Sequence, residues 1–309
     1  MDIAAYYFPN YHRDSRNEKR HGKGWTEWEL MKCARPRFEG HRQPIVPAWG
    51  YQDEADPAVM AAKIDAAVAH HVDTFIFDWY WYDGPFLQRA LDEGFLSAKN
   101  NSKMKFALMW ANHDWYDRHP VGRDIAKAPM LYQWSSTRES VGFVWDYIIE
   151  NYMTRANYWR IDDLPFFSIY ATNRFITQMG GVAAAADVLA DFRERAKKAG
   201  LPGIHINAVW YDNLDSAPQC PCPCNDWYTK VGFSSYTSYN CLFSHPLWEK
   251  FPTVTFQEAA KEYLNLMDKA INTLPGPYLP VATVGWDSSP RTIQSETYTL
   301  LGYPYLPIM

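Results

Sequence analysis

Short apolar segments alternate with helical segments along this chain, and most apolar segments end in acidic or aromatic residues. The stretch from Thr74 to Gly84 has the pattern most fully, because Thr-Phe-Ile-Phe is followed at once by Asp-Trp-Tyr-Trp-Tyr-Asp. A short apolar run bounded in this way predicts a strand that is buried on both faces. Strands that alternate with helices predict parallel βαβ units, and barrels of such units carry their chemistry at the carboxyl ends of the strands.

The same pattern recurs and predicts a single barrel. The expected strands lie at Ile3–Phe8, in the first half of Thr74–Gly84, and at Lys105–Trp110, Leu164–Tyr170, Ile204–Trp210, Gly232–Tyr239 and Leu279–Gly285. The expected helices begin at Glu27 and Pro57 and cover about Pro85–Lys99, Arg138–Tyr158, Ala183–Lys198 and Thr255–Ile271. No Gly/Ser-rich linker or charge block divides the 309 residues, so we expect one domain over residues 1–309. Because seven strands are found and not eight, the predicted fold is an α/β (β/α)8 TIM-like barrel that lacks, or is truncated in, its last βα unit.

Composition narrows the classes of function. The formal net charge of -5 argues against a nucleic-acid surface, which needs a basic stripe. Aromatic residues make up 17% of the chain, so some of them are expected to line a binding surface. No apolar run reaches the roughly 18 residues of a membrane span. The first residues have no signal-peptide pattern, which leaves the protein either cytoplasmic or secreted with its signal removed.

The cysteines do not predict a metal site. Three of the five lie in Cys220-Pro-Cys-Pro-Cys224, and the others are Cys33 and Cys241. This spacing differs from the usual zinc pattern, and two prolines stiffen the segment. We therefore expect a rigid loop with one disulfide, no metal and no cofactor.

Five carboxylates are candidates for catalysis. Four of them follow predicted strands and the fifth lies between two tryptophans: Asp78, Asp114, Asp212, Asp287 and Glu27. Asp78 is the strongest, because an unpaired charge directly after an apolar strand would be costly, so it either has a partner or works in the site. Each of the others also has a structural interpretation. Asp212 and Asp287 can start turns, and Glu27 can be a solvated helix residue, while Thr26 and Glu29 have capping-box spacing.

Aromatic, imidazole and amide side chains near the same strand ends are candidates for substrate binding. Aromatic rings beside carboxylates suit a sugar, whose ring faces stack while its hydroxyls need acceptors. The candidates are His12, Trp25, His41, Tyr80, Trp110, Asn112, His113, Trp210, Tyr236 and Trp286. Since neighbours on an extended chain point opposite ways, only one of His113 and Asp114 is expected to face the pocket.

Five motifs in order carry a resemblance to a known family. They are Tyr7-Phe-Pro-Asn-Tyr-His12, Gly24-Trp-Thr-Glu-Trp28, Phe38-Glu-Gly-His41 with Gln43-Pro44, Trp110-Ala-Asn112 through Trp115, and Gly285-Trp-Asp287 to Arg291. Together they resemble the WbsX-like proteins, relatives of glycoside hydrolase family 99. The resemblance spans essentially the whole chain and implies a (β/α)8 barrel that acts on glycans. Family 99 members cleave α-mannosidic linkages inside chains with retention, through participation of the neighbouring 2-hydroxyl, and WbsX-like proteins have been labelled glycosyltransferases.

This chain departs from the family pattern at three places. Asp78 stands where the WbsX-like pattern has His, and His113-Asp114 stands where relatives often carry Glu-Asn. The late Trp-Asn-Glu-Trp motif, which resembles the segment with the family 99 catalytic glutamates, is absent, so those glutamates are carried over to no residue here. We expect a glycoside hydrolase acting on a poly- or oligosaccharide, possibly endo-acting on an α-mannan type. A polysaccharide-building glycosyltransferase and a non-catalytic glycan-binding barrel stay open, although no glycine-rich phosphate loop supports the transferase.

Overall fold

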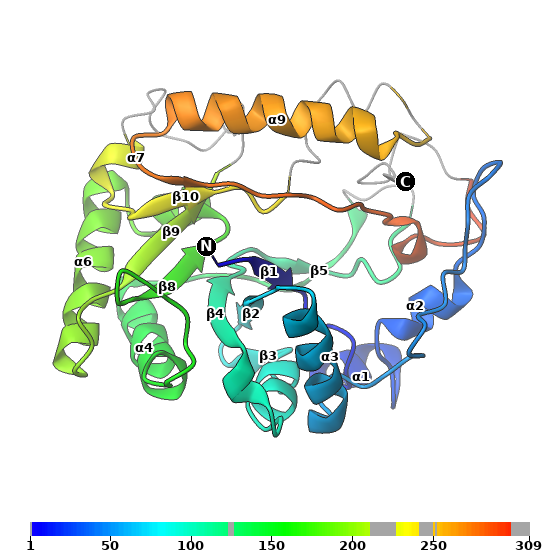
Figure 1. Cartoon of the computed structure of the whole chain (residues 1–309), viewed down its shortest axis with the longest axis horizontal. Coiled ribbons are helices and arrows are strands. Elements are labelled where there is room, and N and C mark those ends of the chain that lie inside the picture. Colours follow the sequence, from blue (N-terminus) through cyan, green and yellow to red (C-terminus); the bar gives the residue numbers. More distant parts are fainter. Residues whose placement is uncertain (1, 123–126, 211–226, 241–249, 251, 298–309) are drawn as a thin grey trace.

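A curled parallel sheet forms the centre of the protein (Figure 1). The computed structural model describes residues 2–122, 127–210, 227–240, 250 and 252–297. Its parallel strands, in spatial order, are β1 (Ala4–Tyr7), β2 (Thr74–Trp81), β4 (Lys105–Trp110), β8 (Leu164–Ile169), β9 (His205–Val209), β10 (Ser235–Thr237) and β11 (Tyr278–Leu279). The spatial order equals the chain order, as successive βαβ units produce. The α/β barrel class is confirmed, and a parallel strand lies at or beside each of the seven predicted places, although β11 shares only Leu279 with the predicted strand Leu279–Gly285. Within the described residues, hydrogen bonds do not join β11 back to β1.

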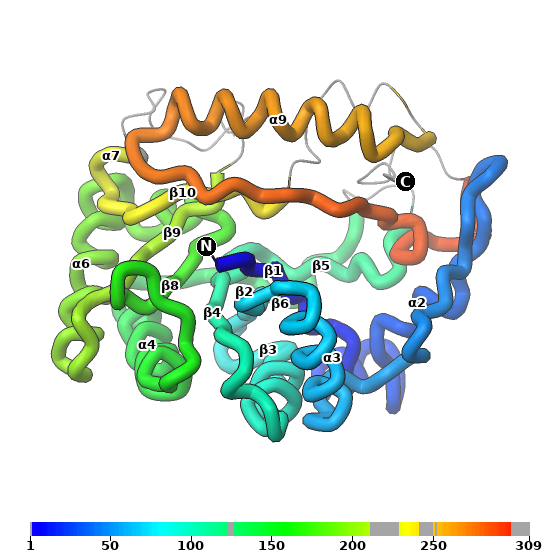
Figure 2. Tube along the Cα trace, in the orientation of Figure 1, coloured from blue at the N-terminus to red at the C-terminus, as the bar shows by residue number. Residues whose placement is uncertain are grey.

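Helices cover the outer face of the sheet, and short helical turns and strands lie around its edges (Figures 1 and 2). The helices are α1 (Ser15–His21), α2 (Trp28–Cys33), α3 (Pro57–Ala69), α4 (Arg138–Ile148), α5 (Thr172–Gln178), α6 (Val182–Lys198), α7 (Trp227–Lys230) and α9 (Phe256–Thr273). Single turns form η1 (Ala90–Phe95), η2 (Asn101–Lys103), η4 (Ile149–Met153) and η6 (Ser289–Arg291). β3 (Pro85–Phe86) and β7 (Arg160–Ile161) pair antiparallel with β2 and β8, while β5 (Trp115–Tyr116) and β6 (Met130–Tyr132) form a separate hairpin. None of the described helices has the length and apolar character needed to cross a membrane.

The helix starts predicted from the sequence are found at two long helices, α3 and α9, whereas the capping box predicted at α2 is not. Asp56 caps α3 by accepting a hydrogen bond from the Ala58 N–H at 2.7 Å, with Pro57 at the first helical position. Thr255 and Glu258 form a capping box at the start of α9. At α2 the predicted box between Thr26 and Glu29 is absent, and the N-cap residue makes no side-chain cap bond.

The predicted helix over Pro85–Lys99 is also largely wrong. Pro85 pairs back onto β2 as part of β3, and helical structure is limited to the π-turn η1. Asp83 and Gly84 have positive φ values of 51° and 135°, so the chain reverses there in a tight turn. The turn closes with a hydrogen bond from the Tyr82 N–H to the Gly84 carbonyl at 3.0 Å. The following residues therefore return along β2.

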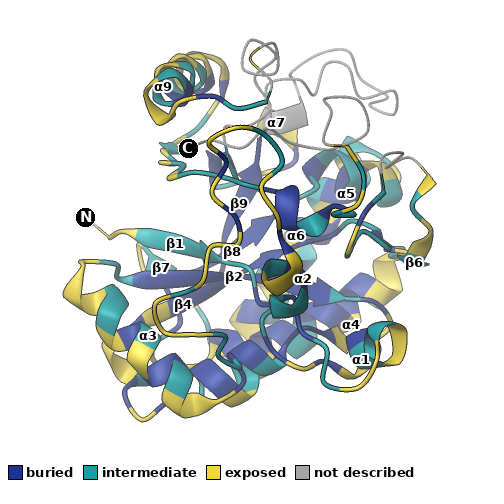
Figure 3. Cartoon of the chain, turned by 90° about the vertical axis from the view of Figure 1, so that its right-hand side faces the viewer, coloured by how far each residue is buried: buried dark blue, intermediate teal, exposed yellow. Residues whose placement is uncertain are grey.

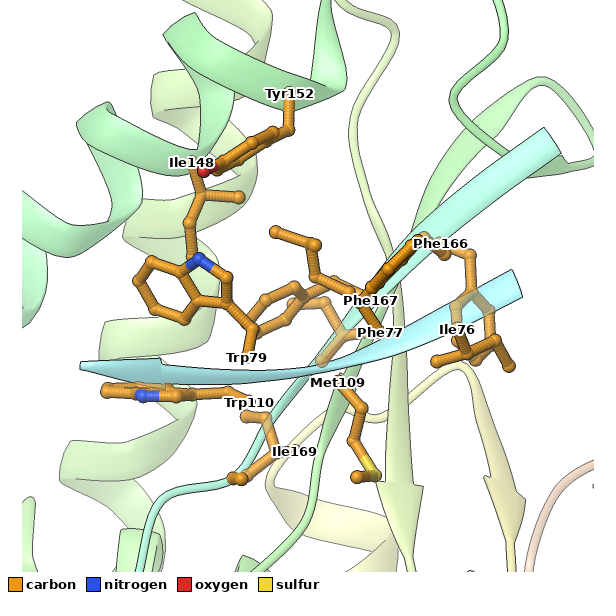
Figure 4. Close-up of a cluster of buried hydrophobic side chains, with 14 of the residues drawn as sticks. Ile76, Phe77, Trp79, Met109, Trp110, Ile148, Tyr152, Phe166, Phe167 and Ile169 are labelled. Carbon is orange, nitrogen blue, oxygen red and sulfur yellow. The ribbon is translucent and has the colours of Figure 1, made fainter. Parts of the chain in front are cut away.

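Strand register divides the sheet into an outward and an inward face. Outward residues such as Phe77 and Trp79 pack in the hydrophobic core against the helices, where Ile148 and Tyr152 lie beside Trp79 (Figure 4). Figure 3 shows the central strands β2, β4, β8 and β9 as almost entirely buried, whereas β1 is of intermediate burial. Burial on both faces explains why these strands read as nearly continuous apolar runs in the sequence.

The inward face carries a polar layer across the barrel. The residues paired in register across the sheet are Asp78, Met109, Ser168, Asn207 and Ser235. Ser168 donates a hydrogen bond to Asn207 at 2.8 Å, and Asn207 donates one to Ser235 at 2.9 Å. These bonds satisfy buried polar groups that would otherwise be costly in the interior. Asp78 lies in the same layer, next to Met109, but its hydrogen bond comes from Tyr239 and not from these side chains.

Candidate functional site

A cavity of about 590 Å³ opens at the carboxyl ends of the parallel strands. Its described walls come from β2 and β4 themselves and from the segments that follow β1, β4, β8, β10 and β11, so polar residues that are far apart in the sequence share one mouth. Four of the five carboxylates proposed from the sequence line it: Glu27, Asp78, Asp114 and Asp287. The fifth, Asp212, lies outside the described residues.

Asp78 is a buried carboxyl group in the cavity wall. Its Oδ2 accepts a hydrogen bond from the Tyr239 hydroxyl at 2.9 Å, and its Oδ1 has no partner among the described residues. Burial raises the pKa of Asp78 to about 7, although the Tyr239 bond and the charge of Arg291 oppose the rise. Asp78 can therefore hold a proton near neutral pH and release it there.

Glu27 has the opposite electrostatic environment. It is buried, accepts a hydrogen bond from the Asn10 amide at 2.8 Å and pairs with the Arg291 guanidinium. Burial alone would raise the pKa of Glu27, but the charges of Arg291 and His119 and the bonds from Arg291 and Asn10 together lower it. Because these partners occupy the carboxylate, it is not the solvated helix residue that the sequence left open. Glu27 is an ionised carboxylate at neutral pH.

The other two carboxylates are held by neighbours at the rim. Asp114 accepts two hydrogen bonds from Arg174, at 2.6 and 2.9 Å. Burial would raise the pKa of Asp114, but the Arg174 bonds outweigh it and the pKa is lowered. Asp287 lies 3.0 Å from the His41 ring nitrogen Nε2 and accepts a hydrogen bond from Gln43 at 2.6 Å.

Asp287 is also a turn former, since it accepts a hydrogen bond from the Ser289 N–H at 2.8 Å. Burial would raise the pKa of Asp287, yet its hydrogen bonds from His41, Ser289 and Gln43 lower it overall. The turn that the sequence left open for Asp287 is therefore present, and Asp287 also lines the cavity, while its catalytic role stays a prediction.

Aromatic and imidazole side chains complete the cavity. Of the proposed substrate-binding residues, Tyr80, His113 and Trp286 line it. Adjacent residues His113 and Asp114 both line it, so the expectation that only one of them faces the pocket is wrong. The reason is that they lie in the irregular segment after β4, where side chains do not alternate as they do in a strand.

The other seven proposed binding residues do not line the cavity, although one of them, His41, contacts the lining residue Asp287. Trp110 packs against Trp134 and Trp145 with ring centroids 5.4 and 5.2 Å away, on the helix side of the sheet. Trp210 and Tyr236 are likewise buried in the hydrophobic core. All three rings point outward for the same reason. Side chains alternate between the two faces of a strand, and these rings lie at the positions next to those in register with Asp78, which point inward.

The remaining three are Asn112, Trp25 and His12, which also lie outside the cavity lining. Asn112 is fully buried and exchanges hydrogen bonds with the backbone of Ala171 at 2.7 and 3.0 Å. Trp25 stacks on His21 with a centroid distance of 4.3 Å. His12 is fully buried, and burial lowers its pKa to about 4, so it is neutral.

Several cavity residues were missed from the sequence. They are Tyr11, Arg118, His119, Tyr170, Arg174, Tyr239 and Arg291. Arg291 closes one of the family-like motifs, and Tyr239 ends a predicted strand, so both had a visible signal. Arg118 and Arg174 had none, because a lone arginine in a loop or helix is usually a surface residue. The described residues hold no cluster of three or more His, Cys, Asp or Glu side chains that could bind a metal ion.

Comparison with known proteins identifies the family. A family model described as "Glycosyltransferase WbsX" matches residues 3–300. The chain belongs to the WbsX family. Two curated relatives, both named "Uncharacterized protein WxcX" and from two strains of Xanthomonas campestris pv. campestris, are 30% identical over 210 residues. The match covers 67% of this chain and 28% of each relative, so this WbsX-family chain corresponds to a minor part of their length.

Solved structures share the fold of this WbsX-family chain. The GH99 endo-alpha-mannosidase from Bacteroides thetaiotaomicron aligns with a TM-score of 0.56 and 12% identity, over 94% of this chain and 73% of that one. A structure titled "Glycoside hydrolase-like protein" aligns with a TM-score of 0.56 and 14% identity, over 96% and 75% of the two chains. At such identities the likeness establishes the barrel architecture alone.

Proposed function

We propose that this chain is a carbohydrate-active enzyme that hydrolyses a glycosidic bond of a poly- or oligosaccharide in the strand-end cavity. The observation that carries the proposal is the contrast between two carboxyl groups in one cavity. Asp78 has its pKa raised to about 7, and the pKa of Glu27 is lowered. Environments that push two carboxyl pKa values apart provide a proton donor and an ionised partner at the same pH. Glycosidases need such a pair on either side of the scissile bond.

The roles follow from the protonation states. Protonated Asp78 donates its proton to the glycosidic oxygen as the bond from that oxygen to the anomeric carbon breaks. The carboxylate of Glu27 faces the positive charge that develops on the sugar, and it either attacks the anomeric carbon or takes a proton from an attacking water. Tyr239 fixes the orientation of Asp78, and Arg291 and Asn10 fix that of Glu27. The stereochemical outcome depends on which of its two roles Glu27 takes.

The wall of the cavity supports a saccharide as the ligand. Tyr80, Trp115 and Trp286 line it beside the carboxylates, and aromatic faces pack against the apolar faces of sugar rings. The volume of about 590 Å³ suits a few sugar units. The fold likeness to an enzyme named an endo-alpha-mannosidase adds an analogy and makes α-mannan the first substrate to test.

A second candidate is a glycosyltransferase, which the description of the family favours. Such an enzyme would use the same acidic cavity but would transfer a sugar from an activated donor to an acceptor hydroxyl. The two candidates differ in whether a nucleotide sugar is consumed. A non-catalytic glycan-binding barrel is the remaining alternative, and it predicts binding with no turnover.

The test incubates the protein with α-mannan, β-glucan, a deacetylated glycan and an acidic polysaccharide, and measures hydrolysis by the release of reducing ends. We expect turnover of at least one glycan, with a loss of about 100-fold or more in Asp78→Asn and in Glu27→Gln, as for general acid–base groups. Asp65→Asn is the matched control, because Asp65 is exposed and pairs with Lys103 away from the cavity. Full hydrolysis by both variants would refute these roles. Consumption of a nucleotide sugar without hydrolysis would favour the transferase instead.

A further inference from the structure

Arg118 places a guanidinium in the cavity wall without a carboxylate partner among the described residues. It lies in the segment between β5 and β6, with its charge 4.6 Å from the centroid of the Tyr116 ring. Its Nε is buried and has no described hydrogen-bond partner. The neighbouring Asp117 does not neutralise it, because that carboxylate pairs with Arg20.

The carboxylates of the cavity are likewise committed elsewhere. They pair as Glu27 with Arg291, Asp78 with Tyr239, Asp114 with Arg174, and Asp287 with His41. Arg174 and Arg291, the other two described arginines of the lining, are therefore neutralised within the protein. Burial lowers the pKa of His113, and it lowers that of His119 to about 4, so these two lining histidines are uncharged at neutral pH and add no cation. Arg118 is the described lining cation left without an ion pair.

Backbone hydrogen bonds on both sides of Arg118 tie its segment to other parts of the protein. On one side, the Asp117 N–H donates to the Pro129 carbonyl at 2.8 Å. On the other, the Val121 N–H donates to the Arg291 carbonyl at 2.7 Å, and the Ile293 N–H donates to the Val121 carbonyl at 3.0 Å. The loop is thus attached to the same turn that carries the partner of Glu27. A ligand at Arg118 would lose little affinity to ordering of the loop.

A partly enclosed guanidinium is suited to one kind of ligand group. Arginine offers a planar fork of donors that matches the paired oxygens of carboxylate, sulfate and phosphate. A neutral sugar would leave this charge partly desolvated and without a counter-charge, which is unfavourable. An anionic sugar would supply the missing charge.

We propose that the saccharide bound in this cavity carries an anionic substituent, and that Arg118 binds it. The substituent is a carboxylate, as in a uronic acid, or a sulfate or phosphate ester. This proposal rests on the proposed function and adds the substrate class. It makes Arg118 a specificity residue, whereas Asp78 and Glu27 carry the chemistry.

The experiment compares matched neutral and acidic oligosaccharides by calorimetry. The probes are mannose, glucose and galactose oligosaccharides, their uronic acid, sulfated and phosphorylated counterparts, and UDP as a separate source of anionic oxygens. The wild type is expected to bind at least one acidic probe about tenfold or more tightly than its neutral counterpart, which is the typical effect of a hydrogen bond to a charged group. The preference should weaken as salt is raised.

Arg118→Gln should reduce this preference to about one, and Arg118→Lys should keep part of it, because lysine retains the charge but loses the fork. Arg155→Gln is the control, since Arg155 is exposed and lies outside the cavity lining. The Lys variant also keeps the test valid if the Gln variant folds poorly.

Equal binding of acidic and neutral probes by the wild type would overturn the proposal and leave saccharide binding intact. An acidic preference that persists in Arg118→Gln would place the anion site elsewhere and overturn it as well. UDP binding that depends on Arg118, with no acidic preference among saccharides, would assign the anion to a nucleotide donor. Absence of binding by every saccharide would overturn the proposed function itself.

Discussion

Replacing Asp78 with Asn should stabilise the fold, and the gain should grow with pH. The folded-state pKa of Asp78 is raised to about 7 from an ordinary value of 3.8. Between these values the folded protein binds a proton that the unfolded chain releases, so stability falls as pH rises through this window. Asn is neutral at every pH and can still accept the Tyr239 hydrogen bond, so the variant lacks this loss.

The magnitude follows from the shift. A difference of about three pKa units at 1.36 kcal/mol per unit gives a cost of about 4 kcal/mol once Asp78 is fully ionised, above about pH 7. Below the ordinary value of 3.8 the wild type carries none of this cost. Across the window, the advantage of Asp78→Asn should grow by about 1.4 kcal/mol per pH unit and then level off.

Urea unfolding of both proteins at about pH 5, 6, 7 and 8 measures this difference, because other titrating groups are common to the two chains and cancel. The gain between about pH 5 and pH 8 should be about 2–3 kcal/mol. Asp65→Asn serves as the control and should show no such growth, because Asp65 is exposed. A flat difference, or a variant less stable than wild type at about pH 8, would refute the claim that burial dominates at Asp78.

Three further predictions follow from the same contacts. Arg291→Gln should lower the unfolding free energy at neutral pH by about 3–5 kcal/mol, because it leaves the buried Glu27 without its cation. The loss should shrink as pH falls through the lowered folded-state pKa of Glu27, and a pH-independent loss in urea unfolding would contradict it. Hydrolysis should fall as pH rises through about 7, because Asp78 then loses its proton. It should also fall at acidic pH below the ordinary Glu range, because Glu27 then gains a proton. A kcat/KM profile without the fall at alkaline pH would contradict the role of Asp78. Gly94→Ala should lower the unfolding free energy, measured in urea, by about 1–3 kcal/mol, because its new Cβ would lie 2.1 Å from the Glu54 carbonyl oxygen. Gly142→Ala is the control and should lower it little, because its new Cβ meets only the flexible Arg195 side chain, at 3.0 Å. Equal costs for the two glycine variants would rule out the steric reason.

The sequence was sufficient to predict the barrel and most of its acidic mouth. Buried parallel strands appear as apolar runs, and the polar residue that interrupts such a run is visible at once, as Asp78 is in Thr74–Gly84. The spacing of helices and strands then places the ends of all the runs at one edge. That geometry alone brings Glu27, Asp78, Asp114 and Asp287 to one cavity.

The binding rings were harder to predict, because a run of apolar residues hides which of its positions point inward. Three of the proposed rings lie in or at the ends of strands, but each is next to an inward-facing position and so points outward: Trp110, Trp210 and Tyr236. A one-residue difference changes the face of a strand, and only the register with neighbouring strands decides it. Asp78 marks the inward face of β2, and its partner Met109 then places Trp110 on the outer face.

Loop residues were beyond prediction for a different reason. The positions of Arg118 and Arg174 depend on contacts between segments that are far apart in the chain, such as the backbone bonds between Val121 and Arg291. No local pattern encodes these contacts. The Thr26–Glu29 capping box is absent at α2, where Glu27 is the N-cap residue and the Glu29 carboxylate pairs with Lys32.

The ion pair between Glu27 and Arg291 joins residues 264 positions apart. The length-dependent part of the entropic cost of closing a chain loop of that length is about 5 kcal/mol. Strands β2, β4 and β8 meet over much shorter separations, so we expect them to assemble early. The mouth would then be the last region to acquire its native arrangement during folding. A partly folded molecule would have a native-like core before its cavity is formed.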